Sequence, residues 1–169
     1  MTGCPARIGS LRPDGVAYWE SAPEAATTLL RAVASGAAQQ TAVGQVMLAF
    51  SADIADDDMI SRGRRNRGSD GGITCGAIEQ ALSLIRLSGI AITRNPQPNR
   101  RLSVAVPVTD AGGGVDAALE LDVEGFDQVE SVLGDLQAAS RRLSEQGITT
   151  RGLALPGEVT KSIMDHDDH

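Results

Sequence analysis

Residues 102–123 read LSVAVPVTDAGGGVDAALELDV, a stretch in which two alternating runs flank a glycine-rich turn. Each run places apolar residues at every second position, as strands with one buried face do. Residues 109–114 are turn formers, and glycine can take the positive φ that a chain reversal needs. The stretch therefore predicts an antiparallel hairpin that sets residue 102 opposite 121, residue 104 opposite 119 and residue 103 opposite 120.

The two faces of the predicted hairpin differ in size and polarity. One face is entirely aliphatic, whereas the other is small at Ala105 and Ala118 and polar at Ser103 and Glu120. Protein interiors pack almost as densely as organic crystals, so the space above the small residues must be filled. Either a closely packed helix or a small ligand can fill it.

Length and composition limit the class of protein. The 169 residues suffice for one domain with its own core. One Trp, one Tyr and two Phe offer few stacking platforms for bases, and a formal net charge of −7 gives no overall attraction to DNA or acidic membranes. Cys4 and Cys75 have neither disulfide nor metal-site spacing, and no apolar run is long enough to span a membrane. We expect a cytoplasmic protein without membrane contact, cofactor or metal.

Further strands and helices are expected on both sides of the hairpin. Strands are predicted over residues 7–12, 16–21 and 90–94, the first two around the turn Pro13-Asp14-Gly15. Helices are predicted over residues 42–51 with Thr41 as N-cap, over 75–87 with Thr74 as cap and Gly89 as left-handed end, and over 126–145 before Gly147. Residues 56–60 fit a short helix and residues 61–72 a flexible Arg- and Gly-rich loop. This order predicts an α+β fold, a mostly antiparallel sheet with helices packed around it.

Two positions raise specific questions. Gly44 lies inside a predicted helix, where it costs about 1 kcal/mol relative to alanine. A close approach of the backbone to the sheet or to a ligand would explain it. Tyr18 and Trp19 point to opposite faces of their strand, and the Trp19 ring can either anchor a core or line a pocket.

The sequence offers only weak candidates for a catalytic site. Cys75 lies near a predicted helix start, where a thiolate is favoured, but no histidine precedes His166. Glu120 and Asp122 form a carboxylate pair that could do acid–base chemistry if their environments differed. Because no nucleophile, histidine or phosphate loop accompanies that pair, no catalytic residues are assigned and the chain is not expected to be an enzyme.

Three segments resemble the effector-binding domain of IclR-type transcriptional regulators. LSVAVPVTDAGGGVDAALEL resembles the strand–turn–strand core of that domain, GAAQQTAVGQVMLAF (residues 36–50) its HATALGKALLAF segment, and RIGSLRPDGVAYWES (residues 7–21) its opening hairpin. They occur in family order and at family-like spacing, over roughly residues 6–147. The resemblance implies a GAF-like fold. It also favours a strand over about residues 27–33, although the alanine-rich run 23–38 fits a helix by propensity.

The resemblance also implies a small-molecule pocket between the sheet face, the loops above it and one helix start. Carried over to this chain, it points to Thr41, Ala42 and Val43 on the helix and to Ser103, Glu120 and Asp122 on the strands, with Trp19 and Thr93 as further ligand-binding candidates.

The chain departs from the family pattern at several of these positions. Gln39 and Gln45 replace a common histidine and lysine, and two carboxylates replace two hydroxyls. Ionised carboxylates would repel an organic acid at close range. Either Arg94, Arg100 or Arg101 neutralises them, or the ligand is cationic or polyhydroxylated, or Glu120 faces solvent and the pocket is vestigial.

The expected organisation is an effector-binding domain over residues 1–150 and a partly disordered tail over 151–169. The expected function is that of the small-molecule-sensing and oligomerisation domain of an IclR-type bacterial regulator. Its partners would be an effector and further copies of itself, in a dimer or tetramer. DNA would be reached only through a winged helix–turn–helix that this sequence does not contain. The alternatives are a stand-alone GAF-like ligand-binding or interaction module and, less favoured, a small enzyme that uses Cys75 or the Glu120/Asp122 pair.

Overall fold

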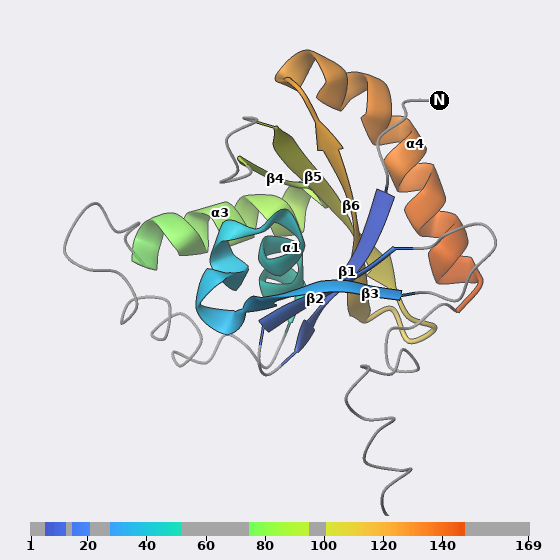
Figure 1. Ribbon diagram of the computed structural model, residues 1–169, viewed down its shortest axis with the longest axis horizontal. Coiled ribbons are helices and arrows are strands. Elements are labelled where there is room, and N and C mark those ends of the chain that lie inside the picture. Colours follow the sequence, from blue (N-terminus) through green and yellow to red (C-terminus); the bar gives the residue numbers. More distant parts are fainter. Residues whose placement is uncertain (1–5, 13–14, 21–27, 52–74, 95–100, 148–169) are drawn as a thin grey trace, which may run out of the picture.

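A six-stranded antiparallel sheet with helices on both faces forms the domain, in the strand order β3-β2-β1-β6-β5-β4 (Figure 1). The computed structural model describes residues 6–12, 15–20, 28–51, 75–94 and 101–147. The strands are β1 Ala6–Arg12, β2 Gly15–Glu20, β3 Thr28–Ala34, β4 Ala91–Arg94, β5 Leu102–Thr109 and β6 Val115–Val123. The helices are the 3-10 helix η1 Ser35–Gln40 and the α-helices α1 Ala42–Phe50, α3 Cys75–Ser88 and α4 Phe126–Glu145. The predicted α+β class is confirmed.

The central hairpin is present, but its predicted register is wrong by two residues. Leu102 lies opposite Val123, Ser103 opposite Asp122 and Val106 opposite Leu119. At the turn, Thr109 pairs with Val115, one residue further along β6 than the predicted register implies. The register then slips by one more residue between Val108 and Thr109, and the two steps together give the shift of two. Since side chains alternate with period two, a shift of two leaves every residue on its predicted face.

The aliphatic face of the hairpin packs against α4. Its buried side chains are those of alternate residues on β5 and β6, and α4 contributes Val129, Val132 and Leu136. The helix has the predicted bounds, and Gly147 follows it with a φ of 64°. Area removed from water on this face is the main stabilising contribution of α4.

The small face of the hairpin packs against α1 in its middle. Ala105 and Ala118 are fully buried in one cluster with Val43, Val46 and Met47 of α1. Of the two fillers considered above, the helix therefore occupies the middle of this face. Gly9 on β1 permits the approach, because a Cβ there would lie 2.7 Å from Val43 Cγ1.

The other helices and strands follow the predictions closely. Thr41 caps α1 by accepting from the Gly44 amide at 3.0 Å, and Gly89 follows α3 with a φ of 69°. The strand preferred over residues 27–33 is β3. The expectations for the Pro13-Asp14 turn, residues 56–60 and 61–72, the Thr74 cap and the 151–169 tail lie outside the described residues. The division into a domain over 1–150 and a tail stays a prediction. None of the described helices is long and apolar enough to cross a membrane.

Candidate functional site

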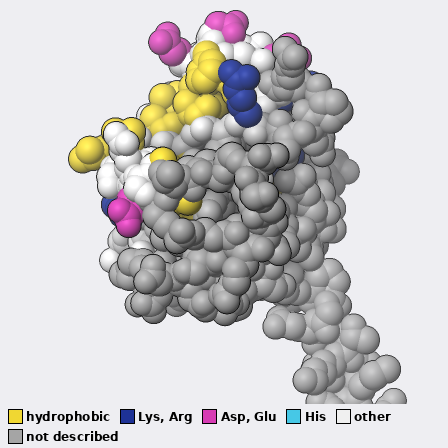
Figure 2. Space-filling model, turned by 90° about the vertical axis from the view of Figure 1, so that its left-hand side faces the viewer, with side chains coloured by type: hydrophobic (Ala, Val, Ile, Leu, Met, Phe, Trp, Pro, Cys, Tyr) yellow, Lys and Arg dark blue, Asp and Glu magenta, His cyan; other side chains and the backbone are white. Residues whose placement is uncertain are grey.

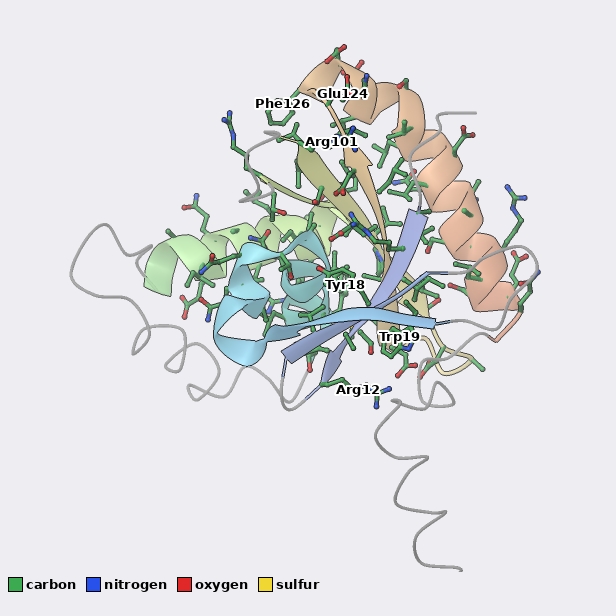
Figure 3. All side chains as sticks on the ribbon, in the orientation of Figure 1. Arg12, Tyr18, Trp19, Arg101, Glu124 and Phe126 are labelled. Atoms are coloured by element: carbon green, nitrogen blue, oxygen red, sulfur yellow. The ribbon has the colours of Figure 1, made fainter. Side chains whose placement is uncertain are left out.

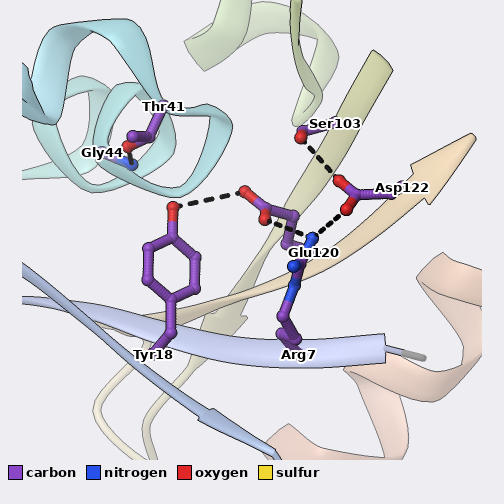
Figure 4. Close-up of polar contacts among 7 residues, drawn as sticks. All are labelled: Arg7, Tyr18, Thr41, Gly44, Ser103, Glu120 and Asp122. Atoms are coloured by element: carbon purple, nitrogen blue, oxygen red, sulfur yellow. Dashed lines mark hydrogen bonds and ion pairs between the residues drawn. The ribbon is translucent and has the colours of Figure 1, made fainter. Parts of the chain in front are cut away.

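A connected polar cluster crosses four neighbouring strands on the α1 side of the sheet (Figure 4). Ser103 Oγ of β5 donates to Asp122 Oδ1 of β6 at 2.7 Å. The Arg7 guanidinium of β1 binds Asp122 Oδ2 and lies 3.2 Å from Glu120 Oε1. Tyr18 Oη of β2 donates to Glu120 Oε2 at 3.5 Å. We call Arg7, Tyr18, Ser103, Glu120 and Asp122 the polar cluster.

Strand pairing creates this cluster. Arg7 is the direct cross-strand neighbour of Glu120, and Ser103 is that of Asp122. Glu120 is only 3% exposed, and a carboxylate so buried is tolerated when it is paired and hydrogen-bonded. Burial lowers the pKa of the Arg7 guanidinium, but the attraction of Asp122 and Glu120 outweighs burial, so this pKa is raised above its ordinary value. Arg7 therefore stays charged beside the two carboxylates.

Access to the polar cluster is uneven. The side chains of Arg7 and Asp122 keep 20% and 14% of their surface exposed, against 4% for Glu120. Thr93 on β4 is the cross-strand neighbour of Ser103 and is half-buried. Arg7 and Asp122 are therefore the more accessible of these three charged side chains.

The start of α1 lies over the same face. Its helix packs against β6 and β1, and Figure 4 draws its first turn, with Thr41 and Gly44, on the side to which the Tyr18 hydroxyl points. Ala42 and Val43 are fully buried, whereas Thr41 is half-buried. The Thr41 hydroxyl also donates to the Ala38 carbonyl at 3.0 Å. The Thr41 hydroxyl therefore both donates one hydrogen bond and accepts another within the chain.

Comparison with known proteins places this architecture in one family. The sequence model of one protein family, described as bacterial transcriptional regulator IclR C-terminal, matches residues 21–145. The chain belongs to the IclR C-terminal domain family. The resemblance to this family, which three sequence segments indicated, is thereby confirmed.

Solved structures share the fold at low sequence identity. The C-terminal domain of the Escherichia coli regulator KdgR has a TM-score of 0.67 at 22% identity, with 86% of this chain and 88% of that domain covered. The inducer-binding domain of Acinetobacter PobR, solved with 3-hydroxybenzoic acid, has a TM-score of 0.65 at 19% identity, with 85% and 89% covered. A Rhodococcus transcriptional regulator has a TM-score of 0.62 at 18% identity; the alignment covers 83% of this chain, which spans 59% of that protein. No curated protein sequence matches the chain.

The IclR-type domain brings most of the predicted site residues onto one sheet face. Ser103, Glu120 and Asp122 belong to the polar cluster, Thr93 flanks it, and α1 begins nearby with Thr41, Ala42 and Val43. Trp19 does not belong to this group. It pairs with Ile8, which packs in the α4-side core, and Arg12 lies 5.6 Å from the centre of its ring (Figure 3). Its burial on the opposite face agrees with the core alternative.

The structure gives the two carboxylates a counter-ion that was not among the three arginines considered, namely Arg7. Arg101 pairs instead with Glu124 at 3.7 Å, the side chain of Arg94 is exposed, and Arg100 lies outside the described residues. Glu120 is also not turned to solvent, so this explanation of a vestigial pocket fails. Arg7 binds both carboxylates because β1 inserts between β2 and β6. Sequence reasoning missed Arg7 and Tyr18 as partners, since Arg7 lies 115 residues from Asp122 along the chain.

The explanation considered for Gly44 also needs correction. A Cβ on Gly44 would lie 2.0 Å from the carbonyl oxygen of Ala38 in η1. The close protein neighbour is thus the preceding turn of the chain and not the sheet. Both carboxylates of the enzyme alternative bind one guanidinium, that of Arg7.

Proposed function

We propose that this chain is the effector-sensing domain of an IclR-type transcriptional regulator and that its effector binds at the polar cluster. Membership in the family supports the general role. The observation that supports the location is the polar cluster itself, which lies beyond the part of the sheet face that α1 fills and leaves the Arg7 and Asp122 side chains partly exposed. The domain acts as a sensor and catalyses no reaction.

Binding would regulate transcription by changing the relative stability of oligomeric arrangements. An effector shifts such an equilibrium only by the difference between its affinities for the two states. The polar cluster is suited to this role, because it links side chains from β5, β6, β1 and β2. A ligand bound to Asp122 would be connected to the other three strands through these hydrogen bonds and ion pairs. DNA contact would come from a separate winged helix–turn–helix.

A thermal-shift screen tests the proposal. Small carboxylates, polyols and amines are added to the wild-type chain, and hits are measured by titration calorimetry. At 100 times its dissociation constant, a specific effector should stabilise the fold by about 2.7 kcal/mol. For a chain of this size, that corresponds to a rise in Tm of roughly 5–10 °C.

The variant Asp122→Asn should weaken effector binding roughly tenfold or more, the effect of one lost charge-assisted hydrogen bond. The matched control is Glu124→Gln, which removes a carboxylate from an exposed position just past the end of β6. Equal affinities in both variants would place the effector elsewhere. A screen without any specific hit would argue for a stand-alone interaction module.

A further inference from the structure

Hydrogen-bonding capacity remains at the more accessible part of the polar cluster. Asp122 Oδ1 accepts from Ser103 Oγ and Oδ2 from Arg7 Nη2, whereas an ionised carboxylate can accept about four hydrogen bonds. Arg7 Nη2 contacts both carboxylates, but Nε has no hydrogen-bond partner and Nη1 makes no hydrogen bond to the described residues. A partly exposed acceptor therefore lies directly beside a partly exposed donor.

The strands next to this pair extend it with hydroxyl groups. Thr93 of β4 pairs with Ser103, and Ser103 pairs with Asp122, so these three side chains form one row across the sheet. Thr93 is half-buried, and its hydroxyl makes no hydrogen bond within the described part of the chain. Arg101 and Glu124, which flank the hairpin strands, form an ion pair with each other. The row therefore offers further neutral polar contacts beside Asp122.

The segment that covers the middle of this face brings no charge to the site. Residues 35–50, which form η1, the cap Thr41 and α1, contain no acidic or basic side chain. Gln45 Nε2 is bound within this segment, because it donates to the Gln39 carbonyl at 2.9 Å. The charges that a ligand meets on the described side chains of the polar cluster are thus those of the sheet, with Arg7 and Asp122 the more exposed.

The exposed apolar side chains of the described residues lie apart from the polar cluster. The large ones are Leu84 and Leu87 of α3, Ile92 of β4 and Phe126 of α4. Figure 2 shows hydrophobic side chains gathered on one side of the molecule. Ile92 points to the α4 face, because it pairs with Val104, and the other three lie on helices. The exposed groups of the polar cluster are therefore suited to a hydrophilic ligand.

We propose that the effector bound at the polar cluster is a neutral polyhydroxylated molecule, held through two neighbouring hydroxyl groups. A hydroxyl group both donates and accepts, so one can donate to Asp122 while its neighbour accepts from Arg7. A carboxylate only accepts and meets the negative charge of Asp122, whereas an ammonium group only donates and meets the positive charge of Arg7. Asp122 thereby determines specificity against organic acids. This inference rests on the proposed function and narrows the class of its effector.

Three six-carbon compounds that differ only at C1 test the ligand class. Glucitol, gluconate and glucamine carry a hydroxyl, a carboxylate and an ammonium group at that carbon, and the same three end groups on the galactitol and xylitol skeletons vary stereochemistry and length. Titration calorimetry measures the affinity of each for the wild-type chain. In at least one set, the alcohol should bind about tenfold or more tightly than its acid and its amine.

The variant Asp122→Asn tests the role of the carboxylate in this selection. It keeps the size of the side chain and removes the charge, so the ratio of alcohol affinity to acid affinity should fall by about tenfold or more. The matched control Glu124→Gln removes a carboxylate whose side chain is 70% exposed, and it should leave the ratio unchanged. Circular dichroism verifies folding, and the wild-type affinities test the ligand class without any variant.

The possible outcomes separate this inference from the proposed function. An acid or amine that binds more tightly than its alcohol, with an affinity that Asp122→Asn changes and Glu124→Gln does not, would overturn the ligand class and leave the effector site in place. An unchanged ratio in Asp122→Asn would also overturn it. If no compound binds, or if no affinity depends on Asp122, the proposed site itself fails, and the inference fails with it.

Discussion

Replacing Arg7 by methionine should lower the free energy of unfolding by about 3 kcal/mol, because it leaves the buried carboxylate of Glu120 without its guanidinium. Methionine keeps most of the side-chain length, so the loss reports mainly on charge. The Asp122 carboxylate loses the same partner. Urea unfolding followed by circular dichroism measures the change.

Two further variants test the explanation. In the Arg7→Met background, adding Glu120→Gln and Asp122→Asn should recover at least about 1 kcal/mol, since no uncompensated carboxylate then remains in the polar cluster. Arg101→Met is the matched control, because its pair with Glu124 spans 3.7 Å and both side chains are well exposed. It should cost less than about 1 kcal/mol. Equal losses at the two arginines would show that the polar cluster contributes no more to stability than a surface pair.

Replacing Gly44 by alanine should destabilise the fold by about 2–3 kcal/mol, although alanine is the better helix former by about 1 kcal/mol. The added Cβ would lie 2.0 Å from the Ala38 carbonyl oxygen and 2.7 Å from Thr41 Oγ1. Relief of the clash requires η1 to move away from α1 and breaks the cap that Thr41 provides. The same unfolding measurement gives the sign and size of the effect.

Gly134→Ala provides the control for this prediction. Gly134 also lies inside an α-helix, α4, but a Cβ there meets no heavy atom within 4 Å. The same substitution should therefore stabilise the fold by about 1 kcal/mol. If both glycine variants change stability in the same direction, the contact between α1 and η1 is looser than the structure indicates.

Elements with strong periodicity could be predicted from sequence, whereas long-range pairing could not. The bounds of α4 follow from its apolar stripe and from Gly147, all within one stretch of chain. The hairpin register was wrong by two because alternation fixes only the face of each residue. Which turn closes the hairpin depends on hydrogen bonds, such as those that Asp110 Oδ1 accepts from the Gly112 and Gly114 amides at 2.8 Å.

The candidate site divides in the same way. Ser103, Glu120 and Asp122 could be assigned to one face from alternation alone, and the family resemblance added the start of α1. Their counter-ion could not be found, because nothing near Arg7 in the sequence distinguishes it from Arg94 or Arg101. Only the insertion of β1 beside β6 brings Arg7 opposite Glu120.

The sequence by itself determined the α+β class, the helices and strands outside residues 23–40, and the small, polar face of the central hairpin, since these depend on local propensity and on side-chain period. The tertiary structure alone decided that α1 fills the middle of this face, that Arg7 and Tyr18 complete the polar cluster, and that Trp19 lies on the other side. Strand order produces these contacts, and strand order depends on packing between segments more than 100 residues apart along the chain.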